Sequence, residues 1–174
     1  GRDVLSRVVS GARVALVASL EAVAVATVIG VPIGLFIGYR GGWWDRVMMR
    51  VVEGVVAIPG LVLAIAALTI VGTGLTNAML AIGVVFAMSF LRLTRGAVLA
   101  TREELYVDAS KVIGTADRTI VVRHVLPNSL TPVIAFLPFR MSAAIVALTS
   151  LDFLGLGVPA STPSLGELLA QGKA

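Results

Sequence analysis

Long apolar runs separated by short polar stretches dominate the chain. No aspartate, glutamate, lysine or arginine occurs between Glu21 and Arg40, or between Glu53 and Arg92. A helix of about 20 apolar residues crosses the hydrocarbon core of a bilayer, whereas a helix of a soluble bundle keeps a polar outer face. Because these runs have no polar face, the pattern predicts membrane-spanning helices.

The apolar runs predict about four spans, all helical. We expect them at residues 12–39, 43–72, 76–90 and 127–151. The second has an amphipathic entry over 43–55, with Pro59 near the start of its apolar part, and the third continues as a helix to residue 102. Pro127 marks the expected start of the fourth span, because proline is favoured in the first turn of a helix. Ser164 and Glu167 have the spacing of a capping box, which predicts a short helix in the tail.

Three glycines of the first span share one helix face. Gly30, Gly34 and Gly38 recur every four residues, so a helix places them on the same side. Small residues at this spacing let a second helix approach closely in a membrane. We therefore interpret them as a helix-packing face in preference to a moving gate, and we expect Pro32 to kink the helix.

Composition agrees with a membrane protein and narrows the function classes. Of the 174 residues, 14% are charged, against about 25% in a typical soluble domain, and the mean hydropathy is +0.98. The net charge is +4, but the basic residues lie at the ends of spans, which favours membrane lipid over nucleic acid as a partner. Since Lys and Arg favour cytoplasmic loops, residues 40–50 and 92–124 are expected inside, and residues 72–77 and the tail outside. The chain has no cysteine, and we expect no metal or cofactor site.

The most polar stretch, "DASKVIGTADRTIVVRHVLP" at residues 108–127, lies between two apolar spans. It predicts two short helices, over about 103–113 and 116–126, separated by a turn at Gly114, where glycine carries no steric penalty. A short cytoplasmic helix with one apolar face can dock into a groove of a soluble partner. An ordinary solvated loop is the alternative that polarity alone would favour.

The spacing of this stretch resembles a known signature. Asp108-Ala109-Ser110, then Gly114, then Leu126-Pro127 resemble the Glu-Ala-Ala, Gly, Leu-Pro signature of permease subunits of bacterial binding-protein-dependent ABC importers. Asp replaces Glu, Ser replaces Ala, and His124 replaces Ile. "RHVLPN", together with "GRDVLSRVVSGARVAL" at the start and "SLDFLGLGVPASTPSLGELLAQGK" at the end, is similar to the dipeptide, oligopeptide and nickel branch, most of all to the subgroup for oligopeptides and microcin C.

This resemblance implies an all-α, polytopic, MetI-like permease domain in the bacterial inner membrane. Family members usually have six spans, so residues 1–174 would be one domain that lacks the first and last of them. Residues 103–126 would be the coupling-helix segment, with Asp108, Ala109, Ser110, Gly114, Leu126 and Pro127 in that role. The implied partners are a homologous permease, two ATPase subunits that bind the ATP, an extracytoplasmic binding protein facing residues 153–174, and a peptide substrate.

Three charged or titratable side chains need separate interpretations. Arg140 lies inside the fourth run, at a depth of about 15 Å for a rise of about 1.5 Å per residue. A charge there is costly and faces a bundle interior or an aqueous path, so we weigh equally a role in the translocation path and a structural pair with Glu21 or a carbonyl. We assign Glu21 an interfacial or paired structural role. His124 has no second histidine, cysteine or organised acid as a catalytic partner, and we interpret it as a helix-end cap.

Other functions remain open. The chain has no G-x-x-x-x-G-K-[ST] phosphate loop, so we expect no ATPase activity of its own, and "GLGVPA" at 155–160 follows no predicted strand, which argues against a dinucleotide site. The alternatives to a peptide permease are an ATP-independent channel or membrane scaffold, or a permease of a non-peptide ABC importer.

Overall fold

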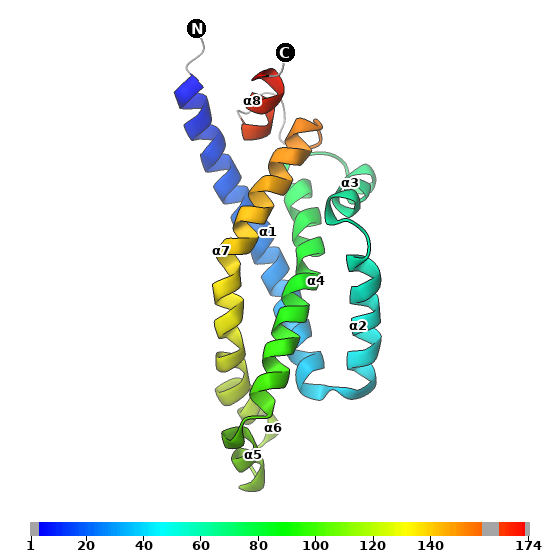
Figure 1. The fold of residues 1–174 in the computed structure, drawn as a ribbon, viewed down its shortest axis with the longest axis vertical. Helices are drawn as coiled ribbons and strands as arrows, with labels where there is room; N and C mark the ends of the chain where they lie inside the picture. Colours follow the sequence, from blue (N-terminus) through cyan, green and yellow to red (C-terminus); the bar gives the residue numbers. More distant parts are fainter. Residues whose placement is uncertain (1–3, 158–163, 173–174) are drawn as a thin grey trace. The chain divides into compact units, whose positions relative to one another are not determined.

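A computed structural model of the chain describes residues 4–157 and 164–172, and within these ranges every regular element is a helix (Figure 1). The all-α class is thereby confirmed. The elements are α1 (Val4–Arg40), α2 (Gly42–Val56), α3 (Gly60–Val71), α4 (Leu75–Arg102), α5 (Leu105–Val112), α6 (Asp117–Ile120), the π-helical segment η1 (Val121–Val125), α7 (Leu126–Phe153) and α8 (Leu165–Gly172). The predicted binding-protein face, residues 153–174, lies partly outside the described residues.

Among the described residues, three helices are long and apolar enough to cross a membrane. They are α1, α4 and the continuous helical run Asp117–Phe153, and a fourth span is reached if α2 and α3 are counted together as one broken span. The first and third predicted spans are confirmed at residues 4–40 and 75–102. The helix α1 continues through Pro32 to Arg40.

The second predicted span, residues 43–72, consists of two helices that are bent by 88° at the break between them. The helix α2 ends at Val56, and α3 begins at Gly60 after Pro59, whose backbone is extended with φ −53° and ψ 125°. Proline has no N–H to donate to the preceding turn, and it pushes the residue before it out of the helical region. The amphipathic stretch that we predicted at 43–55 coincides with α2.

The fourth predicted span, residues 127–151, coincides with α7 (Leu126–Phe153), but Pro127 does not begin the helical run that contains it. Helix α6 continues through η1 into α7 without a break, and the N–H of Leu126 donates to the carbonyl of Val121, five residues back. This wider turn precedes Pro127 directly, and it accommodates a ring that would clash with a carbonyl in a regular helix. Since the helix does not end there, His124 is not a helix-end cap. Its carbonyl accepts a hydrogen bond from Asn128 Nδ2 at 2.6 Å.

The chain divides into two compact units, and α1, α4 and α7 each contribute residues to both. Unit 1 comprises Gly1–Val25, Ile58–Phe86 and Pro138–Ala174. Its core is a cluster of small and aliphatic side chains from α1, α3, α4 and α7, including Ala18, Ala22, Leu68, Met79 and Leu148. The short helix predicted in the tail is confirmed as α8. At its start Ser164 Oγ accepts a hydrogen bond from the N–H of Glu167 at 3.1 Å, which is one of the two hydrogen bonds of a capping box.

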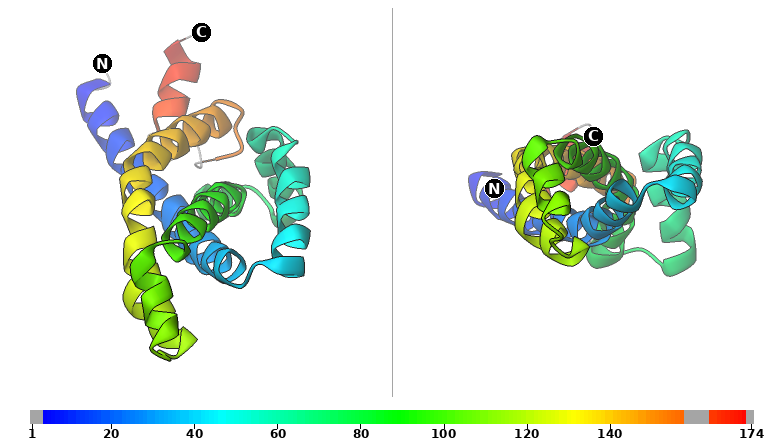
Figure 2. Two further views of the ribbon diagram at one scale, coloured as in Figure 1. Left: turned by 60° about the horizontal axis from the view of Figure 1, so that its bottom comes forward. Right: turned by 90° about the horizontal axis from the view of Figure 1, so that it is seen from below.

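Unit 2 comprises Ala26–Ala57 and Ala87–Leu137. It therefore holds both stretches expected in the cytoplasm, 40–50 and 92–124, whereas the uncharged turn 72–77 belongs to unit 1. In this unit α5 and α6 contact each other and lie beyond the end of α4 (Figures 1 and 2). Its described apolar side chains include a cluster around Val98 and Val107 and another around Ile37 and Leu91.

Candidate coupling site

The helix α5 is short because its sequence sets both ends. Its first turn follows Glu104, which has extended backbone, and it stops before Gly114, whose φ is +80°. Glycine adopts this left-handed conformation without the steric penalty of other residues. Asp108 in the first turn and Lys111 in the last form an ion pair of 2.8 Å, with each charge at the end of the helix dipole that favours it. The predicted break between two short helices thus lies at Gly114.

The inner face of α5 is anchored to unit 2 by one buried side chain. Val107 is fully buried with Val98 of α4, Ile120 of α6 and Val125 of η1, and Leu35 and Tyr39 of α1 pack against the same cluster. Burying an aliphatic side chain of this size contributes about 1.5–3 kcal/mol. The position of α5 is therefore linked through this shared cluster to the helices α1, α4 and α6.

The outer face of α5 is apolar and exposed. We define the docking face as Leu105, Ala109, Val112 and Ile113, which have helical spacing and share one side. Leu105 is 86% exposed, Val112 87% and Ile113 80%. Exposed apolar residues gathered on one helix face, with a buried anchor on the other, are typical of a surface that binds a protein partner.

The structure separates the residues of the signature into two groups. Asp108, Ala109 and Gly114 are exposed on or directly after α5, and Ser110 is partly buried, with its hydroxyl donating to the carbonyl of Tyr106 at 2.8 Å. Leu126 and Pro127 lie at the start of α7, beyond α6 and η1. The first group belongs to the docking helix, whereas the second lies in the long helix that continues from it.

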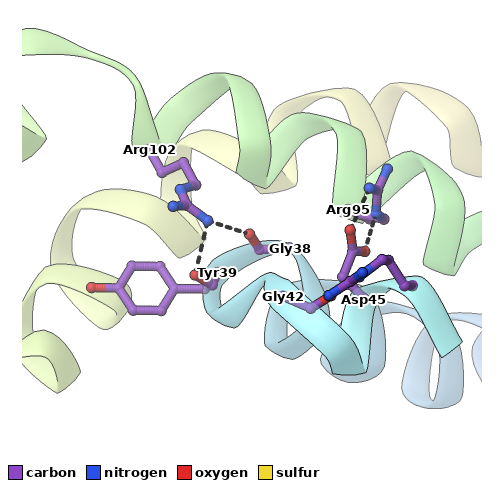
Figure 3. Close-up of polar contacts among 7 residues, drawn as sticks. Gly38, Tyr39, Gly42, Asp45, Arg95 and Arg102 are labelled. Atoms are coloured by element: carbon purple, nitrogen blue, oxygen red, sulfur yellow. Dashed lines mark hydrogen bonds and ion pairs between the residues drawn. The ribbon is translucent and has the colours of Figure 1, made fainter. Parts of the chain in front are cut away.

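Polar contacts that the sequence did not reveal hold the end of α1. Arg102 Nη1 donates to the carbonyls of Gly38 at 3.2 Å and Tyr39 at 3.1 Å (Figure 3). The last carbonyls of a helix have no partner within the helix, so this arginine caps α1 from the end of α4. The hydroxyl of Tyr39 donates to Asp117 Oδ1 at 2.9 Å. The sequence indicates for Arg102 only that it belongs to the basic stretch 92–124, and no local pattern connects it to residues that lie more than 60 positions earlier.

A bidentate ion pair joins α2 to α4. Arg95 Nη2 donates to Asp45 Oδ2 at 2.6 Å, and Arg95 Nε donates to the other carboxylate oxygen (Figure 3). Both side chains are largely shielded from solvent, and such fork-like pairs fix geometry as well as adding energy. This contact was also missed from sequence, because the two residues are 50 positions apart.

The three glycines of α1 lie against α4. A Cβ added at Gly34 would lie 2.6 Å from the carbonyl oxygen of Leu91, and one at Gly38 would lie 3.0 Å from Val98 Cβ; at Gly30 it would lie 2.8 Å from Phe90 Cβ. The backbones of α1 and α4 therefore approach more closely than any larger side chain would allow.

Arg140 lies in unit 1. Its guanidinium carbon is 4.8 Å from the centre of the Phe86 ring, a cation–π geometry that stabilises a charge in an apolar setting. Glu21, which we weighed as its partner, is exposed on α1. The aromatic partner could not be anticipated from the sequence, because Phe86 is one of many apolar residues in α4.

Comparisons with known proteins agree with this architecture. Residues 30–173 match the family described as "Binding-protein-dependent transport system inner membrane component". The glutathione transport system permease protein GsiD of Escherichia coli O6:K15:H31 (strain 536 / UPEC) is 38% identical over 174 residues, which are 100% of this chain and 57% of that protein. GsiD of Shigella boydii serotype 4 (strain Sb227) gives the same values, and GsiD of Shigella dysenteriae serotype 1 (strain Sd197) is 37% identical over the same shares.

A solved structure shows the fold independently. A chain of the methionine ABC transporter MetNI, in inward-facing conformations, superposes with a TM-score of 0.80 at 20% identity, covering 99% of this chain and 83% of that one. The permease-type fold is thereby confirmed, as is the resemblance first seen in the signature. The chain spans 57% of the length of the GsiD proteins and belongs, by the match over most of its residues, to the family of inner membrane components of binding-protein-dependent transport systems.

Proposed function

We propose that this chain is part of the membrane-spanning permease subunit of an ABC importer, in which residues 103–126 couple the translocation path to a separate ATPase. The observation that carries this proposal is the two-sided character of α5. Val107 anchors its inner face to α1, α4 and α6, while the docking face points into solvent. A partner that binds the docking face and moves would displace all three helices through the anchored face.

The proposed assembly contains a homologous permease, two ATPase subunits and an extracytoplasmic binding protein. ATP is bound by the ATPase subunits, because this sequence has no phosphate-binding loop, and the permease itself catalyses no reaction. Binding and hydrolysis of ATP change the separation of the ATPases, and the docking faces follow this change. Such coupling requires that the ATPases make different contacts with the permease before and after this change.

The proposed substrate class is peptides. The GsiD relatives are named for transport of glutathione, which is a tripeptide, and the sequence motifs resemble the peptide branch. Arg140, beside Phe86, is the candidate path residue, since a cation in this position can bind a peptide carboxylate or carbonyl. Replacing Arg140 by Ala, at normal membrane levels, is expected to lower uptake or alter the substrate range. Unchanged uptake over an unchanged range would contradict a role in the path.

The test uses the full-length protein with its partner subunits in liposomes. A single cysteine at Ala109 or Ile113 is expected to crosslink to the ATPase, because both positions lie on the docking face, and a matched cysteine at Val62, exposed on α3 in unit 1, is expected not to. ATP hydrolysis is expected to rise when a peptide-loaded binding protein is added. An ATPase that never associates would favour a channel or scaffold, and stimulation only by a non-peptide ligand would favour another importer branch.

A further inference from the structure

One hydrogen bond connects the coupling segment to the end of α1. The hydroxyl of Tyr39 donates to Asp117 Oδ1 at 2.9 Å, across a sequence separation of 78 residues. Asp117 is the first residue of α6. Tyr39 is the second-last residue of α1. The contact therefore joins a membrane-spanning helix directly to the segment that carries the docking face.

Two further contacts hold Tyr39, one through its backbone and one through its ring. Its backbone carbonyl accepts a hydrogen bond from Arg102 Nη1 at 3.1 Å (Figure 3), and its side chain packs against the apolar cluster around Val98 and Val107. The residue thus meets α4 through its backbone and α6 through its hydroxyl. Because these contacts fix the position of Tyr39, the hydrogen bond from its hydroxyl to Asp117 holds α6 in place relative to α1.

Close packing holds α1 and α6 together over only part of their contact, where Leu35 and Tyr39 meet the cluster that contains Ile120. Tyr39 and Asp117 both line a groove of about 650 Å³, which is bounded by Pro32 and Phe36 of α1 and by Val121 of η1. A filled interface resists displacement through dispersion contacts along its whole length. Beside an open groove, the hydrogen bond contributes a larger share of that resistance, and its loss allows α6 to shift relative to α1.

We propose that Tyr39 and Asp117 form a positioning contact that transmits movement of the coupling segment to α1, and that its loss uncouples ATP hydrolysis from transport. This inference rests on the proposed function, because it requires an ATPase at the docking face. Neither residue belongs to that face, so the contact acts on transmission and leaves docking intact. Helix α6 continues into α7, and the same contact therefore sets the position of α7 relative to α1 within unit 2.

The experiment measures substrate taken up per ATP hydrolysed, with the full-length protein and its partner subunits in liposomes. Tyr39→Phe removes only the donor hydroxyl, and Asp117→Ala removes the acceptor. Each is expected to lower the uptake per ATP by about twofold to tenfold, the range that corresponds to the net contribution of one hydrogen bond. Asp117→Asn is expected to stay near the parental value, because its amide oxygen still accepts a hydrogen bond. Glu53→Gln, which removes an exposed carboxylate on α2, is the matched control and is expected to change nothing.

The double variant Tyr39→Phe/Asp117→Ala separates one shared contact from two independent effects. If the residues act together, the double variant is no worse than either single variant. Additive losses, or a Tyr39→Phe protein with parental uptake per ATP, would overturn the inference. Loss of ATPase co-purification in the Tyr39→Phe protein would also overturn it, because the effect would then be on docking.

Failure of the proposed function is distinguishable from failure of this inference. If the parental protein never captures an ATPase, the proposed function is wrong and the positioning contact fails with it. If the parental protein captures an ATPase that responds to a loaded binding protein, but the Tyr39 and Asp117 variants take up as much substrate per ATP as the parent, the inference alone is wrong.

Discussion

At Gly34 the backbone of α4 leaves no room for a side chain. A Cβ there would lie 2.6 Å from the Leu91 carbonyl oxygen and 2.9 Å from Thr94 Cβ. Gly34→Ala is therefore expected to destabilise the protein by about 1–3 kcal/mol, the usual cost of overpacking. Thermal unfolding of the purified full-length protein in nanodiscs measures this.

The matched control for Gly34 is Gly54, a helical glycine of α2 with nothing within 4 Å of an added Cβ. Alanine is a better helix former than glycine by about 1 kcal/mol, so Gly54→Ala is expected to be neutral or stabilising. Equal effects of the two substitutions would contradict close packing of α1 on α4.

The Arg95–Asp45 pair offers a second comparison between single side chains. Asp45→Asn leaves the largely shielded Arg95 without its carboxylate, and losing a hydrogen bond to a charged group costs about 1.5–3 kcal/mol. Arg50→Gln removes an ion pair with Glu53 in which the arginine side chain is 87% exposed, and such pairs contribute about 0–1 kcal/mol. Thermal unfolding of the two full-length variants is expected to rank them in this order, and a larger loss for Arg50→Gln would contradict the assignment.

At the scale of one element, α5 has two faces that can be tested separately. Val107→Ala removes buried methyl groups and is expected to cost about 1.5–3 kcal/mol, which should speed hydrogen exchange of the α5 amides. Val112→Ala changes a side chain that is 87% exposed, so it is expected to leave exchange unchanged and to weaken capture of the ATPase. Faster exchange in both variants, or in neither, would contradict an anchored inner face and a free outer face.

The elements also show which features of the fold a sequence can reveal. The membrane spans were predictable, because a long run without charged side chains, such as residues 54–91, is typical of membrane-spanning segments. The effect of Pro59 and Pro127 on the helices was not predictable, because proline both starts helices and interrupts them. Which of the two happens depends on the surrounding structure. At Pro59 the helix breaks, whereas at Pro127 a π-helical turn accommodates the ring and the helix continues.

For the whole molecule, sequence spacing located the candidate site but not its connections. The sequence separations between Asp108, Gly114 and Leu126 are local properties of the chain, so they can be recognised from the sequence alone. The contacts of Tyr39 with Asp117, of Arg102 with Gly38 and of Asp45 with Arg95 join residues 50 or more positions apart. They depend on how α1, α2 and α4 pack, which a single sequence without periodic polar signals does not specify.

Charge distribution gives the last prediction, which concerns the orientation of the whole chain. The turn between α3 and α4 has no charged side chain, whereas residues 92–124 carry Arg92, Arg95, Arg102, Lys111, Arg118 and Arg123. Because Lys and Arg are retained on the cytoplasmic side, a cysteine at Thr73 is expected to react with a membrane-impermeant maleimide added to intact spheroplasts of cells making the full-length protein. A cysteine at Lys111 is expected to react only after the membrane is permeabilised. Reaction of both in intact spheroplasts would contradict the orientation, and it would also remove the docking face of α5 from the compartment in which an ATPase could bind it.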